Sequence, residues 1–174
     1  IEGYLTEGLK SFQDMQGYEL NVIVHGLQPG DVVSLGKRLK LRAFRTYHPA
    51  PSLGYAVFES INKLKPEFKA LPGDELRRRR LANEPIFDME ERLYFAYATD
   101  TLPDVLKHEP WLKNVREFML ECTFLDDRKS VANARRGGHI HLDELRPLLE
   151  SFRNRRLHLM HFSQLYTPDE VRGI

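Results

Sequence analysis

Four side chains able to bind a metal ion or to transfer a proton occur at or beside the ends of predicted strands. His48, Asp100 and His161 each stand at the end of a strand, and His139 lies in a loop that follows another. Ligand and catalytic groups collect at strand ends because the sheet fixes their positions while the tips stay accessible. Two histidines and an aspartate suit zinc or manganese. The chain therefore has the donors for a metal site, if folding brings them together.

Taken singly, each of these residues also has an ordinary structural interpretation. His48 precedes a proline and fits a turn, and Asp100 precedes a threonine and fits a turn or a helix cap. His161 lies in an apolar run typical of a core histidine, and His139 fits a solvated loop. Because the residues are scattered from position 48 to position 161, their spacing alone establishes no metal site.

The composition limits the class of protein. At 174 residues the chain is long enough for one domain with a buried core. The 26 Lys and Arg residues nearly balance the 25 Asp and Glu residues, so net charge indicates no nucleic-acid or membrane partner. Cys122 is the only cysteine, which excludes an intrachain disulfide and favours a reducing compartment. With no membrane span and no signal peptide in the pattern, we expect a protein of the cytoplasm or an organelle.

The elements that must position these residues follow a strand-rich and then an alternating pattern. Periodicity and turn signals predict an early helix at 6–15 and strands at 19–27, 32–36, 39–47 and 54–60. The later elements are a helix at 74–81, a strand at 92–100, a helical turn at 103–107, a strand at 116–124, a helical segment at 141–152 that Pro147 interrupts, a strand at 157–162 and a helix capped by Thr167. This order predicts an α/β chain with a mixed sheet.

A basic stretch separates the two halves of the chain. Residues 63–80 hold seven positive and three negative side chains, with Phe68 as the one aromatic residue. A patch that contacts an RNA backbone has this composition, and so does a solvated basic helix. On composition alone the solvated helix is the favoured interpretation.

Five motifs in one order resemble the C-terminal half of the metallo-β-lactamase fold, and within it the ribonuclease Z branch of tRNA 3′-processing endonucleases. In chain order they are "FRTYHPAPSLGYAVFE" (44–59), "FAYATDT" (95–101), "FMLECTFLDD" (118–127), "ARRGGHIHLDEL" (134–145) and "LHLMHFSQLY" (157–166). The resemblance implies an αββα four-layer sandwich of the α/β class. Residues 1–174 would be a single domain that forms its C-terminal part, about one and a half of the two facing sheets.

The resemblance also implies roles for individual residues. His48 would bind one metal ion, His161 the other, and Asp100 would bridge them. His139 would be the catalytic acid or base, with Glu121 as its supporting residue. The implied cofactor is zinc, as two ions in the complete site, with manganese as the alternative.

Four further positions are assigned to substrate binding or its support. Arg135 and Arg136 stand beside His139 and could contact a phosphate or be solvated. Ser163 and Tyr166 match motif positions that support the last ligand, and we group them with the substrate contacts.

The chain departs from the ribonuclease Z pattern in several places. The His-x-His-x-Asp-His signature is absent, and "HIH" (139–141) is followed by Leu-Asp-Glu. In the family this signature lies in the N-terminal part of the fold. Because the chain also begins without methionine, we expect that part on another segment or chain of the same protein. Thr99 stands where the family usually has Gly before the bridging Asp, and Leu165 stands where it usually has Arg before the final Tyr. The 52 positions from His48 to Asp100 leave little room for a tRNA-binding arm and contain no Gly-x-Pro motif.

The sequence thus predicts a metal-dependent hydrolase once the missing part is present. The leading hypothesis is a phosphodiesterase or endoribonuclease of the tRNA 3′-processing kind, which uses a metal-held hydroxide on RNA or a small phosphodiester. One alternative is a hydrolase of the same fold that acts on another ester or small molecule. A second alternative is a non-catalytic interaction module without a complete metal site. We also expect a homo-oligomer, most simply a dimer, and no membrane partner.

Overall fold

A computed structural model describes residues 2–173 of the chain and, of Glu2, the backbone only. The described residues form one six-stranded sheet whose strands lie side by side in sequence order. The strands are β1 (Val32–Leu35), β2 (Leu39–Arg45), β3 (Leu53–Leu64), β4 (Phe87–Ala98), β5 (Glu117–Glu121) and β6 (Arg156–Met160). The mixed α/β class is confirmed, whereas the expectation of one and a half sheets is wrong for these residues.

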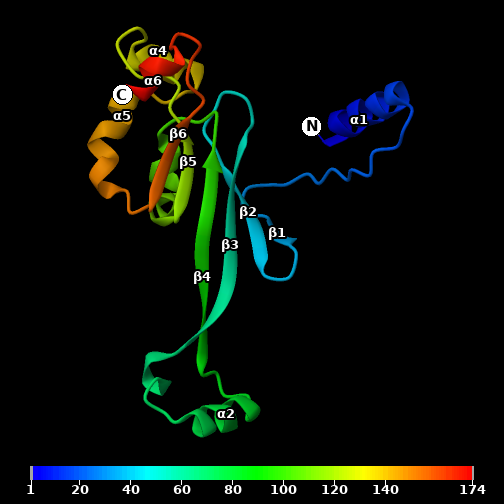
Figure 1. Cartoon of the computed structure of the whole chain (residues 1–174), viewed down its shortest axis with the longest axis vertical. Helices are drawn as coiled ribbons and strands as arrows, with labels where there is room; N and C mark the ends of the chain where they lie inside the picture. The colour runs from blue at the N-terminus through cyan, green and yellow to red at the C-terminus, as the bar shows by residue number, and fades with distance from the viewer. Residues whose placement is uncertain (1, 174) are drawn as a thin grey trace.

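Strand direction changes at β4. From β1 to β4 each strand is antiparallel to its neighbour. Short connections join β1 to β2 and β2 to β3, whereas a longer segment, residues 65–86, joins β3 to β4. β4, β5 and β6 run parallel, and parallel strands need longer crossover connections that usually contain helices. Figure 1 shows these helices gathered around β5 and β6 and not around β1 and β2.

The helices and 3₁₀ turns are short apart from the first. The α-helices are α1 (Glu2–Gln16), α2 (Gly73–Leu81), α3 (Asp104–His108), α4 (Val131–Gly137), α5 (Leu142–Leu145) and α6 (Pro168–Arg172). The 3₁₀ turns are η1 (Pro66–Phe68), η2 (Pro110–Asn114) and η3 (Arg146–Ser151). The core lies on the parallel side, where Phe118 and Leu120 of β5 pack in one buried cluster with residues of α3, η2 and α5.

Side-chain N-caps begin α4, α5 and α6. The Thr167 and Glu170 side chains form the predicted capping box of α6. The helical pattern at 141–152 is split as Pro147 predicts, since α5 ends at Leu145 and η3 follows. The predicted loop before His139 is wrong: Ser130 caps α4, and the helix ends only at Gly138, whose φ of 86° is the left-handed conformation of a C-cap glycine.

A long ribbon carries the basic stretch away from the sheet. β3 and β4 pair over twelve residues each and extend past β2, with η1 and α2 at their tip (Figure 1). The ion pair Lys63–Glu90 (2.5 Å) joins β3 to β4 within the ribbon, and Arg42 of β2 pairs with Glu91 of β4 (2.6 Å). The expectation that 48–100 leaves little room for an arm is therefore wrong, since paired strands use few residues to span a long distance.

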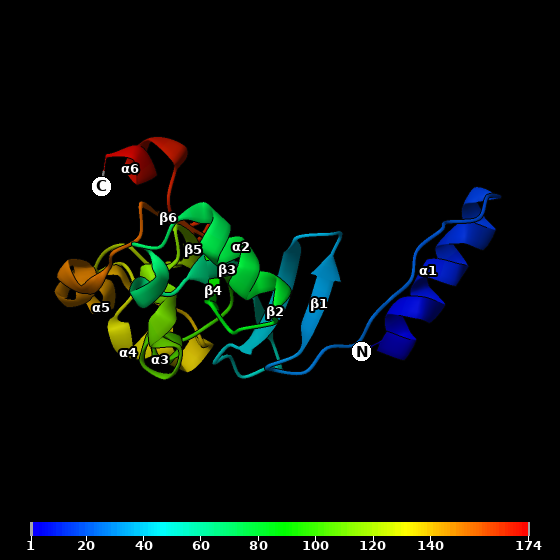
Figure 2. The ribbon, with the colours of Figure 1, turned by 90° about the horizontal axis from the view of Figure 1, so that it is seen from below.

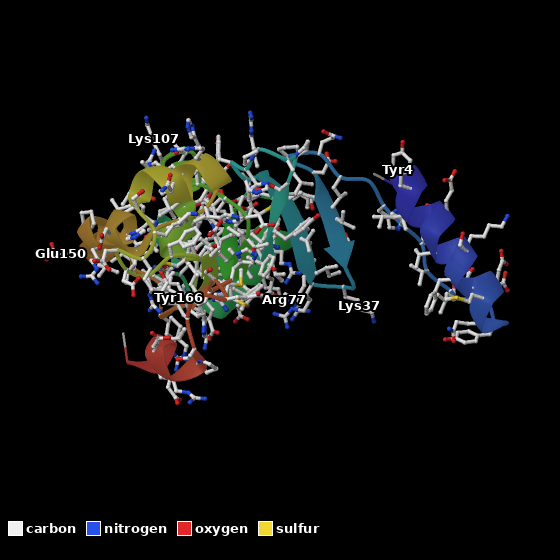
Figure 3. The ribbon with its side chains drawn as sticks, turned by 90° about the horizontal axis from the view of Figure 1, so that it is seen from above. Tyr4, Lys37, Arg77, Lys107, Glu150 and Tyr166 are labelled. Carbon is white, nitrogen blue, oxygen red and sulfur yellow. The ribbon has the colours of Figure 1, made fainter. Side chains whose placement is uncertain are left out.

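The N-terminal segment has little contact with the sheet. Residues 19–27, predicted as a strand, form no strand, because no neighbouring strand supplies hydrogen bonds. The sequence predicted that the first helix starts at Thr6, but α1 begins earlier. It stands apart from the sheet in three views (Figures 1, 2 and 3). Large apolar side chains are exposed here, with Tyr4 82%, Ile23 75% and Met15 72% accessible. Large apolar side chains that are exposed together are typical of a surface that another chain or segment covers.

We predict that the chain by itself self-associates through this N-terminal surface. In light scattering coupled to size exclusion, it should run above its 20.4 kDa monomer mass. The substitutions Tyr4→Ser and Ile23→Ser should shift it toward monomer, because each removes exposed apolar area. Leu149→Ser, which changes an equally apolar exposed side chain on η3, is the matched control and should not. A monodisperse 20.4 kDa monomer with a cooperative melt would contradict this prediction.

Candidate metal centre

The candidate centre lies at the carboxyl ends of the three parallel strands. Asp100 comes two residues after β4, Glu121 is the last residue of β5, and His161 directly follows β6. Parallel neighbouring strands end at the same sheet edge, so residues that are 21 and 40 positions apart in sequence become neighbours. The fold therefore gathers polar groups here that the sequence keeps separate.

The backbone turns sharply at two of these positions. Asp100 and His161 have φ angles of 49° and 63°, in the left-handed region that residues other than glycine rarely occupy. Such conformations cost of order 1–3 kcal/mol each and persist only where the surroundings impose them. Each turn aims its side chain off the end of a strand toward the same point.

Asp100 and His161 meet without satisfying each other. His161 Nε2 lies 3.1 Å from Asp100 Oδ1, close enough for an ion pair. The contact nevertheless lacks hydrogen-bond geometry, and Asp100 Oδ1 is a buried oxygen with no hydrogen-bond partner. One ligand atom each from Asp100, His139 and His161 lies within 4.8 Å of the others. Because bonds of about 2.0–2.2 Å to one ion place two ligand atoms roughly 3 Å apart, this arrangement fits a divalent metal.

A buried carboxylate organises the residues behind these ligands. The Glu121 side chain is fully buried and accepts four hydrogen bonds. Oε1 accepts from Thr101 N (2.7 Å) and His139 Nδ1 (3.1 Å), and Oε2 accepts from Thr123 Oγ1 (2.7 Å) and Ile140 N (3.1 Å). The bond to His139 places that ring's proton on Nδ1, so Nε2 is the nitrogen left for a ligand or substrate. Glu121 itself contacts no solvent and acts through other residues.

His48 approaches the centre from β2. Tyr47 N donates to Thr101 Oγ1 (2.9 Å) and Leu102 N donates to Tyr47 O (2.8 Å), which attaches the end of β2 to the turn after β4. The His48 ring centroid is 5.5 Å from that of His139. A Cβ on Gly138 would lie 2.6 Å from His48 Cδ2, so only glycine allows this approach.

His48 is not arranged as a ligand in the same way as His161. Its Nδ1 accepts the Ala50 N–H at 3.2 Å, which places the ring proton on Nε2. Metal binding through Nε2 needs a lone pair on that atom, which moves the proton to Nδ1. The long hydrogen bond from Ala50 N would then break. Among the described residues, the group that could hold one metal ion comprises Asp100, His139 and His161, without His48. The role of His48 as a ligand, like that of His139 as a catalyst, stays a prediction.

The predicted substrate contacts have different surroundings. Arg135 Nε pairs with Glu144 Oε1 at 2.5 Å, whereas Arg136 is exposed and no described carboxylate pairs with it. Ser163 N donates to Thr123 O at 2.9 Å, which fits a supporting position beside His161.

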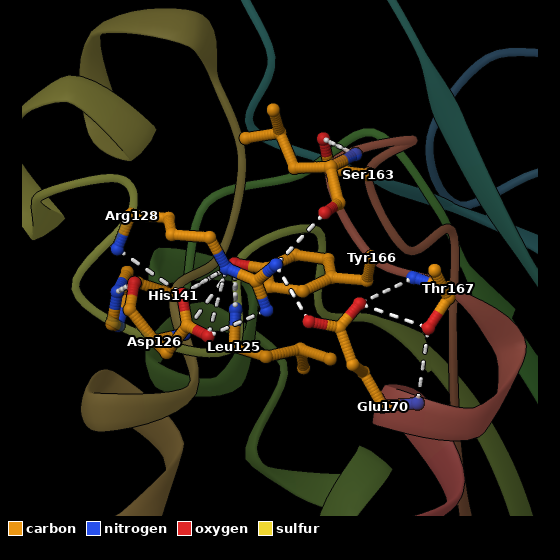
Figure 4. Close-up of polar contacts among 9 residues, drawn as sticks. Leu125, Asp126, Arg128, His141, Ser163, Tyr166, Thr167 and Glu170 are labelled. Carbon is orange, nitrogen blue, oxygen red and sulfur yellow. Dashed lines mark hydrogen bonds and ion pairs between the residues drawn. The ribbon is translucent and has the colours of Figure 1, made fainter.

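Tyr166 is buried and supports the chain rather than facing a substrate. Its hydroxyl accepts from Leu125 N at 2.9 Å and donates to Asp126 Oδ1 at 3.3 Å. Figure 4 shows the Arg128 guanidinium, which lies 4.3 Å from the Tyr166 ring centroid and also pairs with Glu170 at 2.8 Å. These contacts fit a supporting position for Tyr166, and its contact with a substrate stays a prediction.

His141, the other histidine of the "HIH" segment, points away from the centre. It is the N-cap of α5: its Nδ1 accepts from Asp143 N (3.1 Å) and its Nε2 donates to Asp126 O (3.0 Å). Its side chain is buried, and both ring nitrogens form hydrogen bonds.

Two threonines that the sequence patterns did not single out, Thr101 and Thr123, contact Glu121. For Thr123 the sequence signal is a hydroxyl two residues beyond a buried acid at a strand end. Thr101 contacts Glu121 through its backbone N–H, which no side-chain pattern marks.

The structure has a known class of fold. It is similar to the metallo-β-lactamase fold protein YhfI from Bacillus subtilis, with a TM-score of 0.53 and 16% identity, over 94% of this chain and 52% of that chain. It is also similar to human tRNase Z, short form (ELAC1), with a TM-score of 0.56 and 19% identity, over 92% of this chain and 58% of that one. The chain therefore has part of the metallo-β-lactamase fold, as the motifs predicted.

The sequence is related to tRNase Z proteins. It is 36% identical to tRNase Z TRZ1 of Arabidopsis thaliana over 155 residues, which are 88% of this chain and 55% of TRZ1. It is 28% identical over 166 residues to the chloroplastic tRNase Z TRZ2 of the same plant, covering 94% of this chain and 47% of TRZ2. It is also 40% identical over 90 residues to nuclear ribonuclease Z of Triticum aestivum, 49% of this chain and 51% of that protein.

These relatives confirm the resemblance to the ribonuclease Z branch. The chain spans about half the length of the curated relatives that it matches. No family model matches it. None of the helices within residues 2–173 is long and apolar enough to cross a membrane.

Cys122 lies between Glu121 and Thr123 but takes no part in the polar contacts of the centre. Burial raises the pKa of its thiol to about 12, with further contributions from the negative charges of Glu121 and Glu144. We predict that the folded chain does not react with a thiol reagent such as Ellman's reagent at pH 8. A raised pKa leaves only about 1 thiol in 10⁴ ionised at that pH, and the thiolate is the reactive form.

The same reagent should modify one thiol per chain in guanidinium, which provides the control because the unfolded thiol has an ordinary pKa of about 8.5. Stoichiometric reaction of the native chain within minutes would show that Cys122 is accessible and that β5 is not packed as described.

Proposed function

We propose that this chain is part of a metal-dependent hydrolase of phosphodiesters that acts on tRNA precursors near their 3′ ends. The observation that carries the proposal is the convergence of Asp100 Oδ1, His161 Nε2 and the Glu121-held His139 at one sheet edge. The relatives named tRNase Z support RNA as the substrate. A small phosphodiester or another ester is the alternative substrate that the assays below distinguish.

We propose that Asp100 and His161 hold zinc, or manganese as the alternative, with His48 as a further ligand. A bound divalent metal lowers the pKa of a coordinated water toward about 7 and offsets negative charge on a phosphoryl group. This chain offers three such ligands for the two ions of a complete site. We therefore propose that another segment or chain with the His-x-His-x-Asp-His motif completes the site and the N-terminal part of the fold.

The proposed task of His139 is to give a proton to the leaving oxygen. Its Nδ1 proton is held by Glu121, so a proton carried on Nε2 would make the ring positively charged. The adjacent buried carboxylate holds the orientation of that ring, as an acid beside a catalytic histidine does in general. Arg136, exposed and without an ion pair among the described residues, is the proposed phosphate contact beside it.

The proposed RNA-binding part is the tip of the ribbon. Within α2, Arg78 and Arg79 form ion pairs with Glu75 at 2.5 and 2.8 Å. Arg77 and Arg80 have no ion pair with any described residue and lie three positions apart, on one helix face. These two guanidinium groups are thus available to phosphates.

For the cell, we propose a protein of the cytoplasm or an organelle that works as a dimer. The relatives carry the names chloroplastic tRNase Z and nuclear ribonuclease Z, which describe those proteins and leave several compartments open for this one.

We predict that His139→Ala in the completed protein lowers turnover of a 3′-extended pre-tRNA by roughly 10²–10⁴-fold, because a positioned proton donor contributes that much. Metal content, measured by atomic emission, should not change. His161→Ala should lose metal together with activity. His158→Ala changes a histidine that pairs with Glu117 outside the centre and should change neither quantity.

Two results would contradict these assignments. If His139→Ala removes the metal, then His139 is a ligand, as its place in the three-residue group allows. If wild-type protein hydrolyses bis(4-nitrophenyl) phosphate but not pre-tRNA, the substrate is another ester and the tRNA proposal fails.

We predict that Arg77→Gln and Arg80→Gln each weaken pre-tRNA binding and reduce its log–log salt slope by about 1, since each removes one phosphate contact. Hydrolysis of bis(4-nitrophenyl) phosphate should stay unchanged, because α2 is far along the ribbon from the sheet edge (Figure 1). Arg78→Gln is the matched control: Glu75 already offsets this charge, so its effect should be smaller. Equal effects at Arg77 and Arg78 would argue against a specific contact face.

A further inference from the structure

Thr123 is the residue that connects the buried carboxylate to the ligand at the end of β6. It lies two positions beyond the end of β5, and its side chain is nearly buried, with 6% of the residue accessible. Cys122 N donates to Met160 O, and Ser163 N donates to Thr123 O, both at 2.9 Å. These two bonds hold the backbone on either side of His161 against the segment that carries Thr123.

The Thr123 hydroxyl has one proton and two neighbours that compete for it. Glu121 Oε2 lies at 2.7 Å and His161 Nδ1 at 3.0 Å. The carboxylate oxygen also accepts the Ile140 N–H, so it acts as an acceptor. The hydroxyl proton therefore goes to Glu121, and the hydroxyl oxygen can only accept from His161. This requires the proton of the neutral His161 ring to lie on Nδ1.

The consequence concerns the other nitrogen of the same ring. With its proton on Nδ1, neutral His161 presents a lone pair at Nε2, the atom 3.1 Å from the unpartnered Asp100 Oδ1. Within the described residues, the Thr123 hydroxyl is the one hydrogen-bond partner of this ring, whose side chain is 44% exposed. The other contacts of the ring are its approach to Asp100 and its stacking on His139, whose ring centroid lies 5.4 Å away.

We propose that Thr123 is a positioning residue that fixes His161 as the Nδ1–H tautomer and so directs its Nε2 lone pair toward the metal position. Glu121 then orients two histidine rings, His139 by direct contact and His161 through Thr123. Outer partners of this kind commonly change metal affinity by about 10–100-fold when they are removed. The relevance to hydrolysis rests on the proposed function, but the tautomer itself does not.

The test is the protonation pattern of His161 in metal-free protein assembled with the complementing segment. Protein labelled with ¹⁵N-histidine is recorded by long-range ¹H–¹⁵N correlation at about pH 8.5, above the ordinary imidazole pKa of about 6.5. His161→Gln assigns the signals. In wild type, Nδ1 should give a protonated-type shift and Nε2 an unprotonated one.

Variants at Thr123 separate the hydroxyl from the shape of the side chain. Thr123→Val keeps the shape and removes the acceptor, so much of the His161 population should move to the Nε2–H form. Thr123→Ser restores the hydroxyl and should restore the wild-type pattern. Thr46→Val removes another buried threonine hydroxyl, which contacts Ser52 and not His161, and should leave the pattern unchanged.

Zinc titration of the assembled protein provides the second measurement. Thr123→Val should weaken zinc binding by about 10–100-fold, and Thr123→Ser by much less. An Nε2–H ring in wild type, or an unchanged Nδ1–H ring in Thr123→Val, would overturn the proposal. If the valine variant does not fold, the wild-type and serine spectra still decide. Failure of wild type to cleave pre-tRNA would overturn the proposed function and leave the tautomer result standing.

Discussion

The candidate site depends on the burial of one carboxylate, that of Glu121. A carboxylate out of contact with water is costly unless its oxygens are hydrogen-bonded, and here both oxygens are satisfied by four donors. The donors come from the turn after β4, the end of β5 and the segment between α4 and α5. Moving any one of these segments would remove at least one hydrogen bond from the buried carboxylate, so the four donors together favour one arrangement of the strand ends.

The change from antiparallel to parallel pairing at β4 divides the molecule by task. On the antiparallel side, β3 and β4 pair as a long ribbon, and the basic helix α2 lies at its end. On the parallel side, the crossover helices bury one face of the sheet and bring the strand ends together. A surface for a charged polymer and a site for metal chemistry can therefore be built from one sheet without sharing residues.

The hydrogen bonds that support the candidate ligands from within the fold are more complete than the set of ligand atoms at the metal position. Asp100 Oδ1 has no hydrogen-bond partner. His48 Nδ1 accepts the Ala50 N–H, so the ring proton lies on Nε2, the nitrogen considered above for metal binding. The exposed apolar side chains of α1 and residues 19–27 lie on the segment that precedes β1. The proposed second half of the fold would both add ligands and cover this apolar surface, and the chain matches about half the length of its relatives.

The sequence by itself determined the features that depend on nearby residues or on motif order. It predicted the Thr167 capping box and the break at Pro147, because caps and proline act within one helical turn. The order of the five motifs predicted the fold class. Only the tertiary structure decided that residues 19–27 lack a strand partner, that 48–100 extend as a ribbon and that Thr123 links Glu121 to His161. Strand pairing and the donors to a buried carboxylate join residues distant in sequence, and no local pattern specifies which partners will meet.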